Sequence, residues 1–257
     1  MTGKIVKIFL FSALLITGAE AIEIKSPGDA VNIAGKQRMF TQRMLKDYAM
    51  IGMNNTFGDP AKDLKDTMDA FTDHLKSLKT YAKDDATKKS LEKVEKLWEP
   101  LQKTLQGKPD ITKAGELQEA LEKLLEVSDE ATKLFVKETG EASGEIVNLA
   151  GRQRMLSQRM ASLYMLKVWG VKDPKFKTKL DETLALFKTS LETLEKSSAN
   201  NDEINTLLAK VKRSFLFFEM MNRSKSKFVP TLIYKKSNDI LKNMNSVTQL
   251  YVSSKSK

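Results

Sequence analysis

The residues best suited to chemistry in this sequence are two arginines, each close to a glycine in a stretch that occurs twice. The stretch is NIAGKQRMFTQRM over residues 32–44 and NLAGRQRMLSQRM over residues 148–160, with nine of thirteen positions identical. The copies begin 116 residues apart, which predicts a duplicated structural unit. Two copies of the unit predict two equivalent sets of side chains.

On a helix, the first copy has two distinct faces. Ile33, Phe40 and Met44 form an apolar stripe that we expect to pack into a core. The opposite face carries Val31, Gly35, Arg38, Met39 and Gln42. Glycine within a helix costs about 0.5–1 kcal/mol relative to alanine, so a glycine one turn before an arginine in both copies indicates close approach by a helix or a small ligand.

Arginine on such a face needs a hydrogen-bond acceptor for its planar, charged guanidinium group. One interpretation is an ion pair between Arg38 or Arg154 and an acidic residue of a neighbouring helix. The other is a carboxylate or planar oxyanion ligand, which a guanidinium binds through charge-assisted hydrogen bonds. Two converging arginines would hold an anion better than one. We therefore expect the copies to meet, either Arg38 with Arg38 and Arg154 with Arg154 across a homodimer, or Arg38 with Arg154 inside one chain.

The repeated motif resembles the signature of the PilJ-type domain, the N-terminal sensory domain of type IV pilus methyl-accepting chemotaxis transducers. It is also similar to the shorter motif in the periplasmic domain of NarX-type nitrate/nitrite sensor kinases. In those sensors a pair of such arginines, each on the first helix of a four-helix bundle, clamps nitrate across a dimer interface. The resemblance implies that role for Arg38 and Arg154. The intervening residues, Lys36-Gln37 and Arg152-Gln153, depart from the small or apolar ones of nitrate sensors, so it implies the class of site and not nitrate itself.

The predicted ligand-binding residues are the equivalent members of the two copies. They are Gly35, Arg38, Met39, Gln42, Gly151, Arg154, Met155 and Gln158. Either glutamine could instead bridge helices, and the sequence leaves both roles open. The methionines stand beside Ile and Leu at helical spacing, which favours core packing over soft-metal binding.

The elements that position these residues are predicted to be helices throughout. Only 12 Gly and 6 Pro interrupt 257 residues, and the segments between them have helical periodicity. Helices are expected over 29–54, 60–83 and 85–105, the second capped by Asp59 and Pro60 and the third kinked at Pro100. A fourth helix should open near residues 107–110. The second half repeats this plan from Asp173-Pro174, and Pro230 should open the last helix.

We thus predict an all-α fold of two tandem four-helix bundles that share one long central helix running to about residue 169. A break between Gly140 and Gly144 would instead fold the bundles against each other. Residues 1–21 resemble a signal peptide, with Lys4 and Lys7 before an apolar run and Ala19-Glu-Ala21 at the cleavage positions. The two bundles would then comprise residues 22–140 and 141–257, in an exported, soluble periplasmic protein.

Composition excludes several function classes. The chain has no cysteine and one histidine, so it can form neither a disulfide nor a metal cluster based on several histidines. We expect no catalytic residues, no metal and no cofactor. The formal net charge of +10 in an exported protein favours anionic ligands, acidic partners or envelope lipids over nucleic acid. Because the lysines are scattered and interleaved with acids, an ordinary solvated basic surface is the favoured interpretation of this charge.

Two functions remain. The first is an exported sensory protein that binds a small oxyanion, such as nitrate or nitrite, and signals through a separate membrane receptor or sensor kinase. The second is a non-enzymatic adaptor of the envelope or of type IV pili, in which the motif serves only to pair helices.

Overall fold

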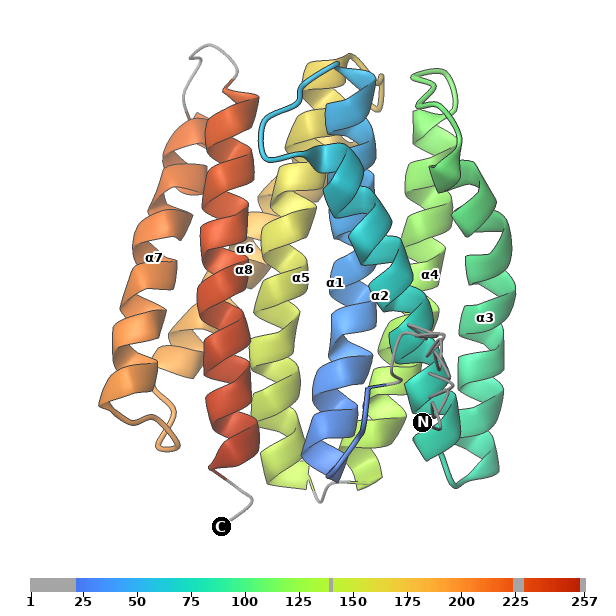
Figure 1. Cartoon of the computed structure of the whole chain (residues 1–257). Helices are drawn as coiled ribbons and strands as arrows, with labels where there is room; N and C mark the ends of the chain where they lie inside the picture. Colours follow the sequence, from blue (N-terminus) through green and yellow to red (C-terminus); the bar gives the residue numbers. More distant parts are fainter. Residues whose placement is uncertain (1–21, 139–140, 224–228, 255–257) are drawn as a thin grey trace, which may run out of the picture.

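The computed structural model describes residues 22–138, 141–223 and 229–254, and these form eight α-helices without a strand (Figure 1). The fold is all-α, as predicted. The helices in chain order are α1 (Pro27–Gly52), α2 (Pro60–Tyr81), α3 (Asp85–Gln106), α4 (Ala114–Glu138), α5 (Glu141–Trp169), α6 (Phe176–Glu195), α7 (Asp202–Arg223) and α8 (Pro230–Ser253). The predicted signal peptide, residues 1–21, lies outside the described residues.

Helix boundaries follow local capping chemistry in the first half. Asp59 accepts a hydrogen bond from the backbone N–H of Lys62, and Pro60 occupies the first turn of α2, as predicted. Pro100 stays inside α3. The fourth helix begins later than expected, at Ala114.

The second half departs from the expected plan at one cap. Helix α6 begins at Phe176, so Asp173-Pro174 does not reproduce the cap of α2. Asp173 accepts from the backbone N–H of Lys175 in the turn that precedes the helix, and forms an ion pair with Lys179 at the start of α6. Pro230 opens α8 as predicted.

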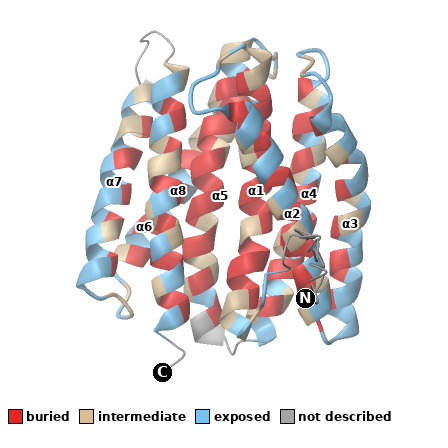
Figure 2. Ribbon diagram, in the orientation of Figure 1, coloured by how far each residue is buried: buried red, intermediate tan, exposed pale blue. Residues whose placement is uncertain are grey.

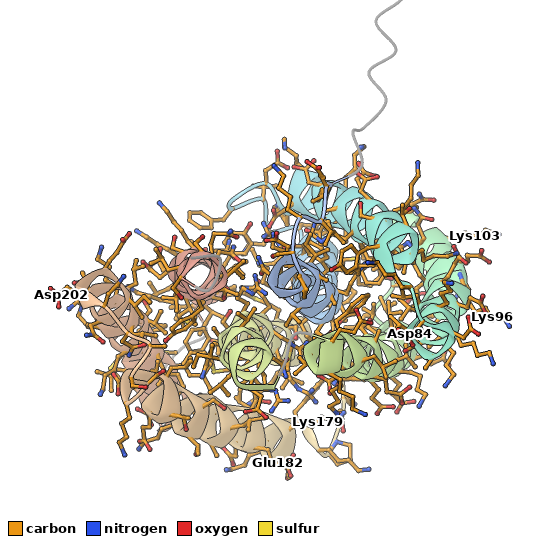
Figure 3. All side chains as sticks on the ribbon, turned by 90° about the horizontal axis from the view of Figure 1, so that it is seen from below. Asp84, Lys96, Lys103, Lys179, Glu182 and Asp202 are labelled. Carbon is orange, nitrogen blue, oxygen red and sulfur yellow. The ribbon has the colours of Figure 1, made fainter. Side chains whose placement is uncertain are left out.

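The central helices α1 and α5 lie side by side and run in the same direction. Arg38 and Gln42 of α1 bond to Asn148 and Ser162 of α5, and the two partners advance along α5 as the positions advance along α1. Helices α2 and α4 pack against α1, and α3 packs against α2 and α4. In the same way α6 and α8 pack against α5, and α7 packs against α6 and α8 (Figures 1 and 3). The halves are thus two four-helix units related by an approximate two-fold axis along the helices.

The predicted continuous central helix is wrong. Helix α4 ends at Glu138 and α5 begins at Glu141, and both helices lie alongside α1, which a single straight rod could not do. The junction itself, residues 139–140, lies outside the described residues. Good helix formers such as Glu141 and Ala142 contribute only tenths of a kcal/mol each, whereas burying whole helix faces between the two halves contributes far more.

Burial is greatest in α1 and α5. Nearly every residue of α1 from Ala30 to Met50 is buried, so both faces that the sequence distinguishes are covered (Figure 2). Each half also contains one close aromatic pair, with ring centroids 4.4 Å apart for Phe71–Trp98 and 4.5 Å apart for Phe187–Phe215. The matched pairs confirm that the duplication extends beyond the repeated motif.

Charged side chains gather at the rim of the molecule seen along the helices, where Lys96, Lys103 and Asp202 point outward (Figure 3). Within the described part of the chain, none of the helices combines the length and the apolar character needed to cross a membrane.

Candidate functional site

The two copies of the motif meet where α1 packs against α5. A Cβ atom added to Gly35 would lie 3.3 Å from the Nη2 atom of Arg38 and 3.4 Å from that of Arg154. A Cβ added to Gly151 would lie 3.0 Å from Nη2 of Arg154 and 3.6 Å from that of Arg38. The two nitrogens are therefore at most 6.6 Å apart, the sum of the last two distances. Arg38 and Arg154 thus converge inside one chain, which is one of the two arrangements expected.

The glycines make this convergence possible. A side chain at either position would come within 3.0–3.4 Å of a guanidinium, tighter than ordinary van der Waals contact. The sequence predicted that a glycine on this face would mark a close approach. The structure identifies the approaching groups as the motif's own arginines, one from each helix.

Arg38 is paired with a carboxylate. Its side chain is 1% exposed; its Nη1 atom donates to Asp129 of α4, and Nη2 donates to the side-chain oxygen of Asn148 at 2.7 Å. Asp129 is itself 20% exposed and forms a second ion pair with Lys133 at 2.7 Å. For Arg38, the interpretation as an ion pair with a neighbouring helix is therefore confirmed.

Arg154 is equally buried but has a different set of partners. Its Nη1 atom donates to the side-chain oxygens of Asn32 at 2.8 Å and of Asn245 at 3.2 Å, and Nη2 donates to the backbone carbonyl of Asn32 at 3.2 Å. No carboxylate of the described residues forms an ion pair with it. The same interpretation is thus wrong for Arg154, whose charge is balanced only by neutral oxygens.

The electrostatics reflect this difference. Burial, and secondly the nearby Arg38, lowers the pKa of Arg154 to about 9, so the group still carries its charge at neutral pH. Burial also lowers the pKa of Arg38, but Asp129 counteracts this effect. Burial, and secondly the charge of Arg154, lowers the pKa of Lys36 to about 8. Lys36 is therefore still mostly protonated at neutral pH and adds to the positive potential near Arg154.

The cluster retains unused hydrogen-bond donors. The Nε atoms of Arg38 and Arg154 are both buried and donate to no acceptor among the described residues. Buried donors without acceptors are rare in native proteins, because each costs free energy comparable to a lost hydrogen bond. Two of them beside an uncompensated charge indicate a site that is short of acceptors and of negative charge.

The other predicted site residues lie in adjoining layers. Met39 and Met155 are buried in the apolar core, at 3% and 6% exposure. Gln42 donates to Glu122 and accepts from Ser162.

Gln158 lies at the position equivalent to Gln42. It donates to the backbone carbonyl of Ser237 and accepts from Lys46. Both glutamines therefore bridge helices in this structure, which is one of the two roles that the sequence left open.

Four residues that contact the arginines were not among the predicted site residues. Asn32 and Asn148 are the first residues of the two motif copies, so the repeat already contained them. Asp129 and Asn245 each stand 91 residues after the arginine that they contact. That equal spacing is the available signal, but a spacing of 91 residues has no meaning until the packing of α4 and α8 is known.

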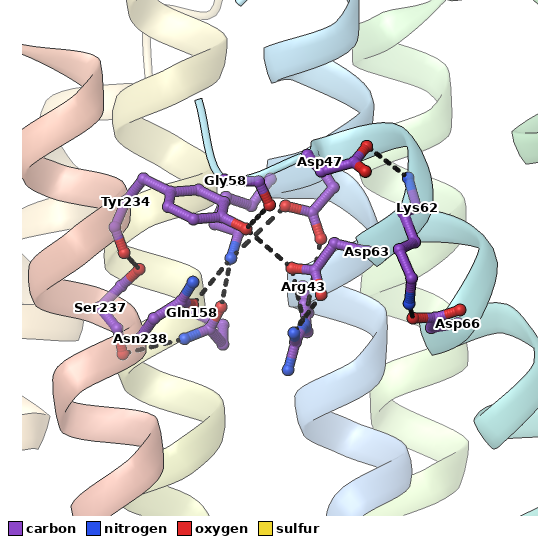
Figure 4. Close-up of polar contacts among 12 residues, drawn as sticks. Arg43, Asp47, Gly58, Lys62, Asp63, Asp66, Gln158, Tyr234, Ser237 and Asn238 are labelled. Carbon is purple, nitrogen blue, oxygen red and sulfur yellow. Dashed lines mark hydrogen bonds and ion pairs between the residues drawn. The ribbon is translucent and has the colours of Figure 1, made fainter. Parts of the chain in front are cut away.

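A second buried polar cluster lies further along α1, near the loop that precedes α2 (Figure 4). The Nζ atom of Lys46 lies 4.2 Å from the ring centroid of Tyr234 and bonds to Gln158 and Asn238, each at 3.0 Å. Asp47, also fully buried, lies 3.4 Å from Lys46. Burial raises the pKa of Asp47 to about 7, against the opposing effect of Lys46. This cluster joins both halves through α1, α5 and α8.

The fold and the arginine cluster define a helical protein of two homologous four-helix units whose first helices bring two buried cations together. The chain belongs to the PilJ family, described as type IV pili methyl-accepting chemotaxis transducer N-term, which matches residues 23–127 and 136–215. This match confirms the resemblance inferred from the motif. Members of the family are sensory domains, generally without catalytic activity and typically extracytoplasmic. Searches among curated proteins and solved structures found no significant match.

Proposed function

We propose that this protein is an exported, periplasmic sensory protein that binds one small oxyanion, of the nitrate or nitrite class, between Arg38 and Arg154. The observation that carries the proposal is Arg154, a fully buried guanidinium with only neutral acceptors that lies beside a second buried guanidinium. An isolated buried charge is expensive, and a bound anion would remove that cost.

The separation of the two guanidinia suits a small ligand. Charge-assisted N–H···O bonds are about 2.7–2.9 Å long, so one bridging oxygen can span up to about 5.8 Å, and two oxygens of one anion can span more. The Nη2 atoms are at most 6.6 Å apart, which two oxygens of one small anion can bridge. In this proposal the anion takes the place of the oxygens that Asn32 and Asn245 now offer to Arg154.

Binding at this place would act on the contact between the two halves. Arg38 of α1 donates to Asn148 of α5, and Arg154 of α5 donates to Asn32 of α1, so both arginines already bond across the interface. An anion would relieve the repulsion between them and would change the relative stability of arrangements of α1 against α5. A separate membrane receptor or sensor kinase is the proposed recipient of that change.

Calorimetry of the mature protein against nitrate, nitrite and small carboxylates tests the proposal. We expect one anion per chain, with no ligand-dependent dimerisation, because both arginines come from the same chain. Arg154→Gln should abolish binding. The matched control is Arg159→Gln, which alters another arginine of the same motif copy, partly exposed and paired with Glu122 at 3.0 Å. If joint replacement of Arg38 and Arg154 by Gln left every measured anion affinity unchanged in a folded protein, the site assignment would be wrong.

The alternative function is an envelope or type IV pilus adaptor in which the motif only pairs helices. The hydrogen bonds that both motif glutamines accept across α1 and α5 favour it, because they need no ligand. An adaptor would bind no small anion by calorimetry, and its arginine variants would lose stability without losing a ligand.

A further inference from the structure

The side chains that bond to the two arginines form equivalent pairs, and one of these pairs differs in charge. Asn32 and Asn148, Gly35 and Gly151, and the two arginines are equivalent pairs separated by 116 residues. The acceptors from the outer helices are a further pair with the same separation, yet α4 supplies Asp129 where α8 supplies Asn245. The side chains around the two arginines therefore occupy equivalent positions in the two halves but differ in charge.

This difference fixes the charge of the cluster. Among the side chains that bond to one another here, two guanidinia and one carboxylate leave one positive charge, and that charge belongs to Arg154 because Arg38 is paired with Asp129. Lys36 does not bond to these groups and adds positive potential from outside the set. Lys133, which also contacts Asp129, is 60% exposed and is largely screened by water. A monovalent anion would neutralise the buried cluster, whereas a divalent anion would leave an excess negative charge that is costly to bury.

Resting on the proposed oxyanion site, we propose that Asp129 is a specificity-determining residue that restricts this site to monovalent anions. Asp129 need not touch the ligand, since it acts by cancelling the charge of Arg38. Its equivalent, Asn245, shows that an asparagine packs against a buried arginine at this position in the same fold. The carboxylate is thus not required for the geometry, and its effect is one of charge.

The structure offers a matched pair of isosteric variants for the test. Asp129→Asn makes both outer acceptors neutral and leaves two uncompensated guanidinia. Asn245→Asp pairs both arginines with carboxylates and leaves none. The exchange Asp129→Asn with Asn245→Asp keeps the net charge and moves the carboxylate from one half to the other.

The probes are perchlorate and sulfate, which share a tetrahedral shape and differ in charge, together with nitrate as a planar monovalent anion. Affinities are measured by calorimetry at fixed ionic strength, and circular dichroism verifies that each variant is folded. The wild-type protein should prefer nitrate and perchlorate to sulfate. Asp129→Asn should shift the ratio of sulfate to perchlorate affinity at least tenfold toward sulfate. Asn245→Asp should weaken nitrate binding at least tenfold, and the exchange variant should recover the wild-type preference.

The outcomes separate this inference from the proposed function. If nitrate binds the wild-type protein and is lost on replacement of Arg38 and Arg154, while both isosteric variants keep the wild-type affinity ratios, then Asp129 does not set the valence and only the inference fails. If the wild-type protein binds none of the three anions, the oxyanion site and the inference fail together.

Discussion

The single histidine provides a sharp test of how tightly the first half is packed beside the arginine cluster. His74 of α2 is 4% exposed, and its ring centroid lies 5.1 Å from that of Phe40. Burial, followed by the positive charge of Lys36, lowers its pKa from 6.5 to about 3, while a hydrogen bond with the backbone of Ile33 opposes the shift. Folding therefore holds this imidazole in its neutral form.

The sign of the effect follows from proton linkage. The pKa of His74 is lower in the folded state than in the unfolded state, so protons bind preferentially to the unfolded chain. The contribution of the neutral imidazole to stability is therefore fully present above pH 6.5 and is lost as the pH falls toward 3. At 1.36 kcal/mol per pKa unit, His74 should account for a loss of about 2 kcal/mol at pH 5 and about 5 kcal/mol once both states are protonated. Typical domains have only 5–15 kcal/mol of stability in total, so the effect should be measurable.

The assay compares wild-type protein with His74→Gln by urea unfolding between pH 8 and pH 5, followed by circular dichroism. The difference in unfolding free energy at pH 8 measures the altered packing. Between pH 8 and pH 5 this difference should change by about 2 kcal/mol in favour of the variant, and that change measures the cost of keeping His74 neutral in the folded protein. In parallel, the imidazole resonances of the one histidine should not titrate between pH 5 and pH 8. A normal titration near pH 6.5, or a pH-independent difference between the two proteins, would refute the argument.

Two further predictions concern the contact between α1 and its neighbours. Asp47 has a pKa of about 7 in the folded protein and 3.8 in the unfolded chain. The stability of the wild-type protein relative to Asp47→Asn should therefore fall by up to about 4 kcal/mol as the pH rises from 4 to 8, which is the opposite direction to the effect of His74. Equal pH profiles of the two proteins in urea unfolding would show that the carboxylate is not buried as described. Gly52→Ala should destabilise the folded protein by about 1–3 kcal/mol, because the added Cβ would lie 2.1 Å from the Trp169 ring. In the control Gly115→Ala the added Cβ meets no atom within 4 Å, so this variant should be neutral or stabilised by up to about 1 kcal/mol. Thermal unfolding that ranks the two variants the other way would contradict the close packing of α1 on α5.

The amino-acid sequence by itself determined the class of fold, the duplication and the positions of the two arginines. Helical periodicity and capping are local properties, so Asp59-Pro60 and Pro230 mark helix starts without knowledge of the rest of the chain. The repeat is a direct comparison of residues, and it placed Arg38 and Arg154 at equivalent positions beside glycines. The resemblance drawn from the same motif agrees with the family match over residues 23–127 and 136–215.

The tertiary structure alone decided how the halves meet. Local propensity favoured one continuous helix through Glu141 and Ala142, but propensity does not report the free energy gained when α1 and α5 bury their faces against each other. That packing turned two predicted sites into one shared cluster. It also brought in Asp129 and Asn245 from helices far away in sequence, and thereby decided which arginine is paired with a carboxylate and which is not. Such a balance of charge depends on distances between side chains, which neither periodicity nor spacing can supply.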